Sequence, residues 1–153
     1  MTGDPSDIRN WLRLSDGVTT SGRLQEGDPQ RLADAGVKRV INLGLAEHPE
    51  ALHDAERAMA DAGLAYIHIP VPFDAPTEAH YHAFVAALEA DDAPVHVHCI
   101  MNWRVSAFLC RYRIERGMDA GEARRQMEQI WSPEENGHPD APKWAAIIRG
   151  EDS

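Results

Sequence analysis

The sequence predicts a single α/β domain, a three-layer sandwich whose central, mainly parallel sheet is covered by helices on both faces. Short β-branched segments alternate with helical segments along the chain, and this rhythm indicates βαβ units. Glycines follow several of these segments, as expected where helices and strands end. The length of 153 residues suits one hydrophobic core and is too short for two ordinary domains. We therefore expect one domain over residues 1–153, with loose order in 1–10 and a C-terminal clasp over 132–153.

The first half of the chain predicts two helices and one strand after a loosely patterned start. The first 22 residues are rich in Asp, Ser, Thr and Gly. Pro29–Ala35 predicts a short helix with Asp28 as its N-cap. Val37–Leu43 is β-branched and predicts a strand, whereas Pro49–Ala62 has the alanine content and apolar spacing of a helix.

The second half continues the same alternation of strand and helix. Its expected segments are, in order, the strand Leu64–Val71, the loop Pro72–Pro76, a helix capped by Thr77 and running through Glu89, the strand Val95–His98, a helix from about Val105 to Arg116, and a last helix from Asp119 to about Trp131. Ligands of parallel sheets bind where strands turn into helix N-termini. Two such strand exits carry chemistry here, one after Val71 and the other after His98.

Composition and charge exclude several classes of function. Fifteen Lys and Arg residues against 25 Asp and Glu give a net charge of −10, so we expect no nucleic-acid partner. The chain has no apolar run long enough to cross a bilayer, and its N-terminus lacks the shape of a signal peptide. Two cysteines suit a reducing compartment. We therefore expect a cytoplasmic domain without a membrane partner, and the sequence leaves its oligomeric state open.

A cysteine stands at the point where a buried strand meets a helix. Cys99 follows the strand Val95–His98, and Arg104 lies five residues further on. A helix N-terminus offers unpaired amide N–H groups and a partial positive charge, which favour a thiolate and a bound oxyanion. An arginine can add two parallel hydrogen bonds to phosphoryl oxygens. This combination suits attack on phosphorus through a cysteinyl-phosphate. The alternative is a buried cysteine with an unrelated surface arginine.

The cysteine segment resembles the active-site loop of the protein tyrosine and dual-specificity phosphatase superfamily. The signature of that superfamily is His-Cys, five residues, Arg, then Ser or Thr. More of the chain resembles its compact bacterial branch over roughly residues 17–131, on three further segments: Ile41-Asn42-Leu43-Gly44, Ala65-Tyr66-Ile67-His68-Ile69-Pro70-Val71 and Pro76-Thr77-Glu78. The resemblance implies a phosphatase-like fold and a phosphate-monoester hydrolase that needs no metal or other cofactor.

The resemblance also implies a role for each matching residue. Cys99 would be the nucleophile, Arg104 the phosphate-binding fork and Asp74 the general acid. Ser106 would help the thiolate leave, and His98 would support the loop and help set the pKa of the thiol. The residues expected to contact the substrate are those of the loop and the helix start: Ile100, Met101, Asn102, Trp103, Val105 and Ser106.

The spacing of the loop departs from the signature in one respect. Only four residues separate Cys99 from Arg104. An ungapped alignment puts Asn102 where the superfamily has its middle glycine, which suits the tolerance of Asn for left-handed backbone. It keeps Ser106 in place and shifts only Arg104. The other alignment has a loop one residue tighter, with Arg104 in its usual role. The sequence leaves both open.

Several supporting residues have two interpretations. Asp74 is either the general acid on a proline-stiffened loop or a turn-forming Asp. Trp103 either walls the pocket and stacks on an aromatic leaving group, or packs against the tail. Trp131, Pro133, Lys143 and Trp144 are expected to form the C-terminal clasp, with Lys143 solvated or adding charge to a pocket. The histidines do not complete a metal site, because His80 and His82 would point apart on a helix.

The predicted substrate is a phosphorylated molecule, either a phosphoprotein or a small aryl phosphate. Two other classes of function fit the loop. One is a phosphate- or phosphopeptide-binding module that has lost turnover because Arg104 is displaced. The other is a rhodanese-type sulfurtransferase, which also places a cysteine loop between strand and helix. Bulky residues such as Ile100, Met101 and Trp103 argue against that second alternative.

Overall fold

The computed structural model of this protein describes residues 3–150. Within that range the chain forms five strands and six helices, in the order β1 (Leu12–Ser15), β2 (Val18–Ser21), α1 (Asp28–Asp34), β3 (Arg39–Asn42), α2 (Ala55–Asp61), β4 (Ala65–His68), α3 (Glu78–Glu89), β5 (Val95–His98), α4 (Trp103–Glu115), α5 (Ala120–Glu128) and α6 (Ala141–Ile148).

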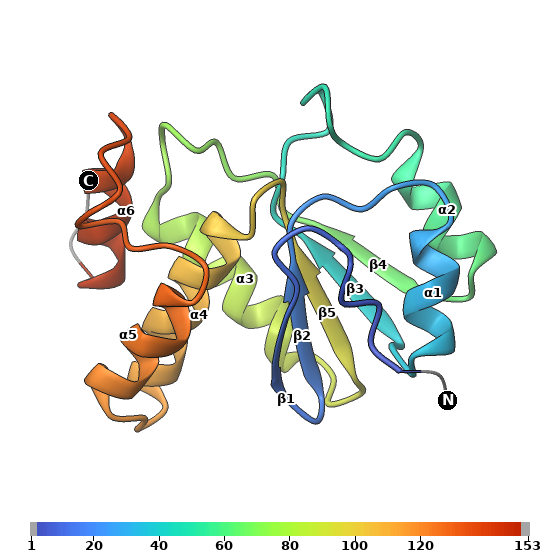
Figure 1. Ribbon diagram of the computed structural model, residues 1–153, viewed down its shortest axis with the longest axis horizontal. Coiled ribbons are helices and arrows are strands. Elements are labelled where there is room, and N and C mark those ends of the chain that lie inside the picture. The colour runs from blue at the N-terminus through green and yellow to red at the C-terminus, as the bar shows by residue number, and fades with distance from the viewer. Residues whose placement is uncertain (1–2, 151–153) are drawn as a thin grey trace.

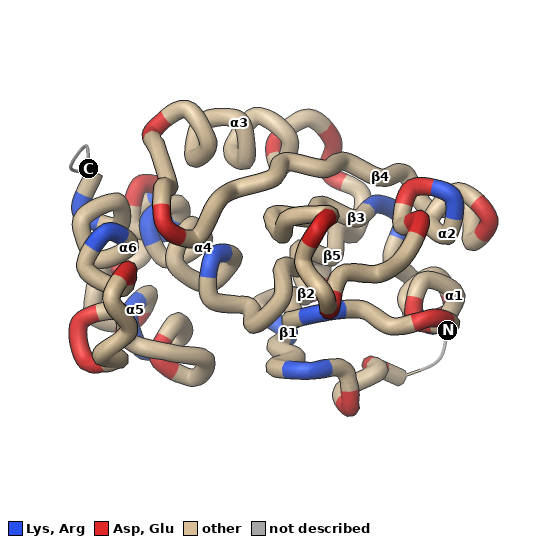
Figure 2. Tube along the Cα trace, turned by 90° about the horizontal axis from the view of Figure 1, so that it is seen from above, with Lys and Arg blue, Asp and Glu red and all other residues tan. Residues whose placement is uncertain are grey.

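The sheet has the strand order β1-β2-β5-β3-β4. The pairs β2–β5, β5–β3 and β3–β4 are parallel, and β1 pairs antiparallel with β2 at one edge. Helices α1 and α2 lie on one side of this sheet, and α3 to α6 lie on the other (Figure 1). The same three layers are visible from above in Figure 2. The predicted fold class, a three-layer α/β sandwich with a mainly parallel sheet, is confirmed.

The central strand β5 is buried along its whole length because both faces of the sheet are covered. Side chains alternate between the two faces of a strand. Val95 and Val97 join the core cluster that also contains α4 residues. On the other face, His96 stacks on Trp11, with ring centroids 5.1 Å apart, and lies beside His98 at 6.1 Å. This alternation explains the sequence Val-His-Val-His.

Parallel pairing brings the exits of β3, β4 and β5 to one edge of the sheet, the upper edge in Figure 1. The turn before β5 lies at the opposite edge, where Arg39 at the start of β3 donates to the carbonyl oxygen of Asp91 at 2.5 Å. The cysteine segment and the loop after β4 therefore share the upper edge, as expected from the sequence.

The loosely patterned start of the chain forms a hairpin, which the sequence analysis missed. β1 has an alternating burial pattern, and β2 is largely buried although it reads Val-Thr-Thr-Ser. The polar side chains of β2 are tolerated because each finds a partner: Thr19 Oγ1 and Ser21 Oγ bind the two ring nitrogens of His96, each at 2.8 Å. Buried polar groups are stable when they are hydrogen-bonded.

The starts of three helices differ from the prediction, and one helix is additional. α1 begins one residue early, after Gly27, so Asp28 lies in the first turn instead of capping it. α2 covers only Ala55–Asp61, because Asp54 has left-handed backbone (φ 50°, ψ 49°) that cannot continue a helix. α4 begins at Trp103, two residues before the predicted start. The predicted C-terminal clasp over 132–153 contains α6, a helix that was not predicted from the sequence.

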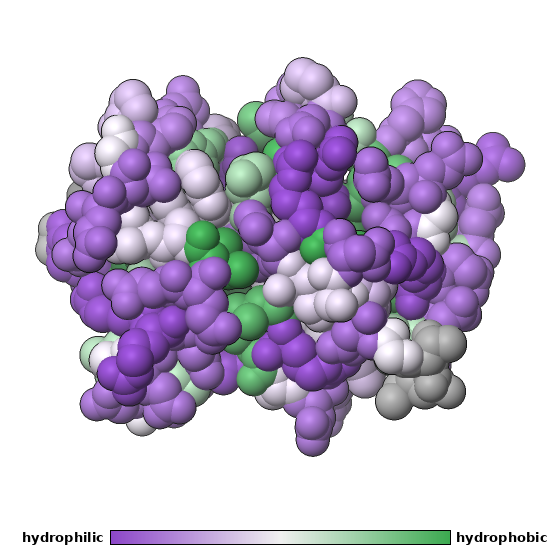
Figure 3. Space-filling view, viewed as in Figure 1, coloured by the Kyte–Doolittle hydropathy of each residue, from purple (hydrophilic) through white to green (hydrophobic). Residues whose placement is uncertain are grey.

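The face of the molecule shown in Figure 3 is mostly hydrophilic, with hydrophobic residues gathered in a narrow band near its middle. This agrees with the high content of charged residues. Among residues 3–150, no helix combines the length and the apolar character needed to cross a membrane.

Candidate active site

Cys99 follows the central strand β5 directly and is fully buried. Its amide donates to the carbonyl of Ser21 in β2 at 3.4 Å, and the carbonyl of His98 accepts from Leu43 after β3 at 2.8 Å. The two neighbouring strands therefore hold the chain on both sides of the cysteine. Gly44, in the loop after β3, lies close to the cysteine backbone: a Cβ added at Gly44 would lie 3.5 Å from the Cα of Cys99.

Asn102 ends the short turn after Cys99 and begins helix α4. Its backbone is left-handed, with φ 66° and ψ 9°, and its side chain is fully buried. Nδ2 donates to the carbonyl of Asn10 and to Thr20 Oγ1, both at 2.9 Å, and Oδ1 accepts from Ser106 Oγ at 3.2 Å. Asn102 thus adopts the conformation that the ungapped alignment requires, and side-chain bonds hold it there.

This arrangement leaves the N-terminus of α4 without a side-chain cap. An Asn at this position ordinarily caps the helix with its own side chain, but the side chain of Asn102 is turned inward to other partners. The first intrahelical bond runs from the amide of Ser106 to the carbonyl of Asn102 at 3.0 Å. The preceding amides of the first turn have no intrahelical acceptor, so they suit an anion.

Arg104 lies on the first turn of α4 and is buried, with 7% exposure. Its Nε donates to the carbonyl of Val71 at 2.8 Å, and its guanidinium carbon lies 5.4 Å from the ring centre of Phe73. These contacts join the cysteine segment to the loop after β4. The bond uses only Nε, and a guanidinium carries further N–H donors on its other two nitrogens.

Asp74 lies on that same loop, and its side chain is exposed. Its carbonyl accepts from Lys143 Nζ at 2.7 Å, and the carbonyl of Phe73 accepts from Trp144 Nε1 at 2.8 Å. The structure therefore brings the Asp74 loop next to Arg104 and attaches it to α6. Lys143 is neither purely solvated nor placed in a pocket, because it binds this loop.

Ser106 and Trp103 have clear partners. The hydroxyl of Ser106 donates to Asn102 Oδ1, so its single proton is already engaged in a hydrogen bond. Trp103 stacks on Trp131 with centroids 4.8 Å apart and a 5° angle, and its carbonyl accepts from Trp131 Nε1 at 3.0 Å. Of the two interpretations of Trp103, packing against the tail is the one observed.

The buried histidines of β5 are held neutral. Burial lowers the pKa of His98 to about 4, and burial also lowers the pKa of His96 well below its usual value. His98 Nδ1 approaches the carbonyl of Cys99 at 3.4 Å, a long contact, and its Nε2 is buried without a hydrogen-bond partner in the described part of the chain. The proximity to Cys99 fits the supporting role predicted for His98, although the single bond is weak.

The rim of the cysteine segment is formed by the N-terminal region. Asn10 Nδ2 donates to the carbonyl of Met101 at 2.8 Å, and Arg9 Nη1 lies 3.5 Å from the sulfur of Met101. The sequence analysis did not predict Asn10 or Thr20 as supports. The β-branched Val-Thr-Thr run is a signal that could have indicated β2 and hence Thr20, whereas nothing local marks Asn10.

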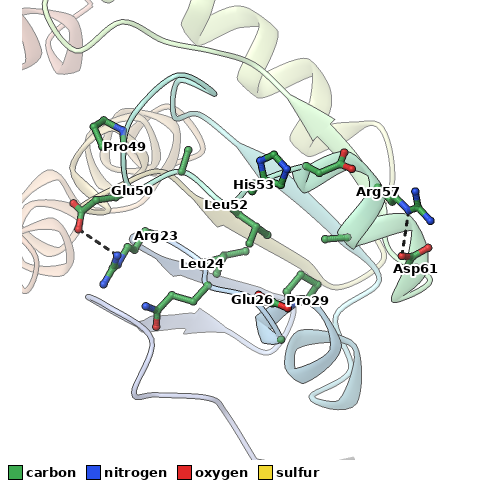
Figure 4. Close-up of a pocket in the computed structure, with 15 residues that line it drawn as sticks. Arg23, Leu24, Glu26, Pro29, Pro49, Glu50, Leu52, His53, Arg57 and Asp61 are labelled. Carbon is green, nitrogen blue, oxygen red and sulfur yellow. Dashed lines mark ion pairs between the residues drawn. The ribbon is translucent and has the colours of Figure 1, made fainter.

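A pocket of about 540 Å³ lies between residues 23–29 and 49–61 (Figure 4). The pair between Arg23 and Glu50, at 3.3 Å, stands at one end of it. The amide of Arg23 also donates to the carbonyl of Ile100 at 2.9 Å. The pocket therefore adjoins the cysteine segment, but none of the predicted catalytic residues lines it. Within residues 3–150, no group of three or more His, Cys, Asp or Glu side chains is arranged to hold a metal ion.

Residues 10–110 match the family described as Beta-lactamase hydrolase-like protein, phosphatase-like domain. The chain belongs to this family. Two Beta-lactamase hydrolase-like proteins of Xylella fastidiosa, from strains Temecula1 and 9a5c, are each 31% identical over 120 residues, which is 76% of this chain. The chain spans only 27% of the length of these relatives.

Solved structures agree with the family. A candidate phosphatase from Shewanella putrefaciens CN-32 is 27% identical, with a TM-score of 0.80 over 95% of this chain and 92% of that one. P. aeruginosa TpbA, solved with pTyr, shares the fold at 23% identity, with a TM-score of 0.71 over 99% and 89% of the two chains. The chain is thus a phosphatase-like domain, as the sequence resemblance implied, and it shares its fold with TpbA.

Proposed function

We propose that this phosphatase-like domain hydrolyses phosphate monoesters through a phosphorylated Cys99. The observation that carries the proposal is the uncapped N-terminus of α4, which starts four residues after this buried cysteine. Backbone amides and the helix dipole at that point favour a bound anion. The side chain of Asn102 is turned away from the helix N-terminus, so the anion position is left to a ligand.

In this mechanism Cys99 Sγ attacks phosphorus, and the bond from phosphorus to the ester oxygen breaks. Asp74 gives its proton to the departing oxygen, so the leaving group departs as an alcohol or phenol. Water then attacks the phosphocysteine, the S–P bond breaks and inorganic phosphate is released. The guanidinium of Arg104 and the amides at the start of α4 stabilise the phosphoryl oxygens.

An aryl phosphate, such as phosphotyrosine in a protein, is the substrate class that we propose. The crystallised relative TpbA was solved with pTyr, and phosphotyrosine is an aryl phosphate. Phe73 adjoins the proposed general acid Asp74 in the sequence, and its half-buried aromatic side chain would offer an apolar surface to a phenyl leaving group.

The test is the release of phosphate from an aryl phosphate in a metal-chelating buffer, with the pH varied between about 5 and 8. Cys99→Ser should abolish turnover, because a serine hydroxyl at this position remains protonated. Cys110→Ser, at the other buried cysteine, is the matched control and should retain it. Activity that survives Cys99→Ser would rule out the phosphocysteine route.

A phosphate-binding module without turnover is the second candidate, and two observations favour it. Cys99 has no exposed surface, and the proton of Ser106 is directed to Asn102. A folded wild-type protein that binds a phosphotyrosine peptide, measured by calorimetry, without releasing phosphate would establish this candidate. The family match favours phosphate chemistry over the sulfurtransferase alternative.

A further inference from the structure

The loop that carries Asp74 is anchored along its backbone by donors from two other elements. Four consecutive carbonyls, those of residues 71–74, each accept a hydrogen bond. The donors are Arg104 Nε to Val71 (2.8 Å), the amide of Ala75 to Pro72 (3.2 Å), Trp144 Nε1 to Phe73 (2.8 Å) and Lys143 Nζ to Asp74 (2.7 Å).

Carbonyls on a surface loop ordinarily bind water, so three side-chain donors within four consecutive peptide groups form a specific attachment. Two of these donors are consecutive residues of α6. Trp144 is fully buried and stacks on the ring of Phe73 with centroids 5.5 Å apart. Lys143 is partly exposed and is itself held by Asp140 Oδ1 at 3.1 Å. The C-terminal helix therefore restrains both the ring and the backbone of the loop.

We propose that Lys143 and Trp144 are positioning residues for the general acid, so that α6 fixes the direction in which Asp74 delivers its proton. This inference rests on the proposed function. Neither residue is proposed to touch the phosphoryl group. Lys143 acts on the peptide carbonyl of Asp74, and Trp144 acts on the peptide that precedes it. A shift of this short loop moves the carboxyl of Asp74 with it.

A positioning role for the acid has a kinetic signature that a general structural role lacks. A leaving group that is already a stable anion needs little protonation, whereas a basic leaving group depends on the acid. Loss of the α6 anchor should therefore slow the hydrolysis of phenyl phosphate far more than that of an aryl phosphate with strongly electron-withdrawing substituents. Uniform loss across both substrates would indicate damage to the fold or to the phosphate site.

The experiment compares wild type, Lys143→Met and Lys38→Met with both substrates. Lys38→Met is the matched control, because it removes the same charge at the opposite edge of the sheet, where the Lys38 amide binds the carbonyl of Pro94. We expect Lys143→Met to lower kcat for phenyl phosphate about tenfold and to change kcat for the activated substrate less than about twofold, since small misplacements cost rate steeply. Lys38→Met should match wild type on both substrates.

A second variant and a double mutant complete the test. Trp144→Phe keeps an aromatic ring in the core but removes the Nε1 donor together with part of the indole volume. It should show the same leaving-group dependence as Lys143→Met, with any loss common to both substrates reporting the lost packing. In an Asp74→Asn background, Lys143→Met should have no further effect, because the group that it positions is gone. Equal losses on both substrates, or an additive loss in the Asp74→Asn background, would overturn the proposal. An inactive wild type would instead mean that the proposed function has failed.

Discussion

Gly22 and Ile100 lie in backbone contact: a Cβ on Gly22 would stand 2.5 Å from the carbonyl oxygen of Ile100. The next amide, that of Arg23, donates to the same oxygen at 2.9 Å. The backbone that follows β2 is thus in direct contact with the turn that follows Cys99. Only a residue without a side chain allows this approach, since the obstacle is backbone and cannot rotate away.

Gly22→Ala should therefore displace the cysteine turn although Gly22 touches no substrate. We expect a loss of about 1–3 kcal/mol in the free energy of unfolding, as for other overpacked sites. Activity should fall with it, because the amides at the start of α4 move. Urea denaturation and phosphate release measure the two effects. Gly17→Ala is the control, since nothing lies within 4 Å of a Cβ there.

Replacement of Asn102 separates its backbone role from its side-chain role. Asn102→Ala must adopt a left-handed conformation at a cost of about 1–2 kcal/mol. It also leaves buried partners such as Thr20 Oγ1 unbonded, at about 1–3 kcal/mol. Asn102→Gly leaves the same partners unbonded but adopts the left-handed backbone without strain. It should therefore be more stable than Asn102→Ala by about 1 kcal/mol. Equal stabilities in urea denaturation would mean that the left-handed backbone is not strained.

Arg104→Lys tests whether the arginine binds substrate as well as Val71. A lysine keeps the charge but has no planar fork, so it cannot hold a carbonyl and a phosphoryl group together. We expect kcat/KM to fall about 10²–10³-fold, the range for loss of a donor to transition-state charge. Arg113→Lys, further along the same helix, should leave kcat/KM unchanged. An active Arg104→Lys enzyme would restrict Arg104 to anchoring the loop.

Stability should fall as the pH decreases from neutral, because buried histidines must become charged on unfolding. Burial lowers the pKa of His98 to about 4 from an ordinary value of 6.5. Between these values the unfolded chain binds the proton and the folded chain does not, so the free energy of unfolding decreases as pH drops. For His98 the loss approaches roughly 3 kcal/mol across that window. Burial lowers the pKa of His96 in the same direction.

His98→Gln removes one of these two titrations. Urea denaturation at pH 7 and near pH 4.5 should give a smaller difference in the free energy of unfolding for His98→Gln than for wild type. The remaining pH dependence then reports His96 and the carboxylates. An identical difference in both proteins would show that His98 already carries its proton in the folded state or remains neutral in the unfolded one.

Local sequence was sufficient for much of the fold and for the position of the cysteine. The strand Val95–His98 was predicted with its observed bounds because β-branched residues with buried histidines are enclosed by turn residues on one side and a helix on the other. Thr77 caps α3 as predicted, with His80 completing the capping box. The left-handed backbone of Asn102 is the one expected from the ungapped alignment, which the sequence left open beside a tighter loop.

Only the tertiary structure decided which distant groups these residues bind. Asn102 meets Asn10 and Thr20, Arg104 meets the carbonyl of Val71, and α6 meets the Asp74 loop. The strand β2 of the N-terminal hairpin pairs with β5, and the β-branched Val-Thr-Thr run is the only local signal of it. Periodicity and capping act over a few residues, so a sequence can indicate them directly. A side-chain donor instead selects whichever carbonyl folding brings within about 3 Å, and that choice depends on the packing of the whole chain.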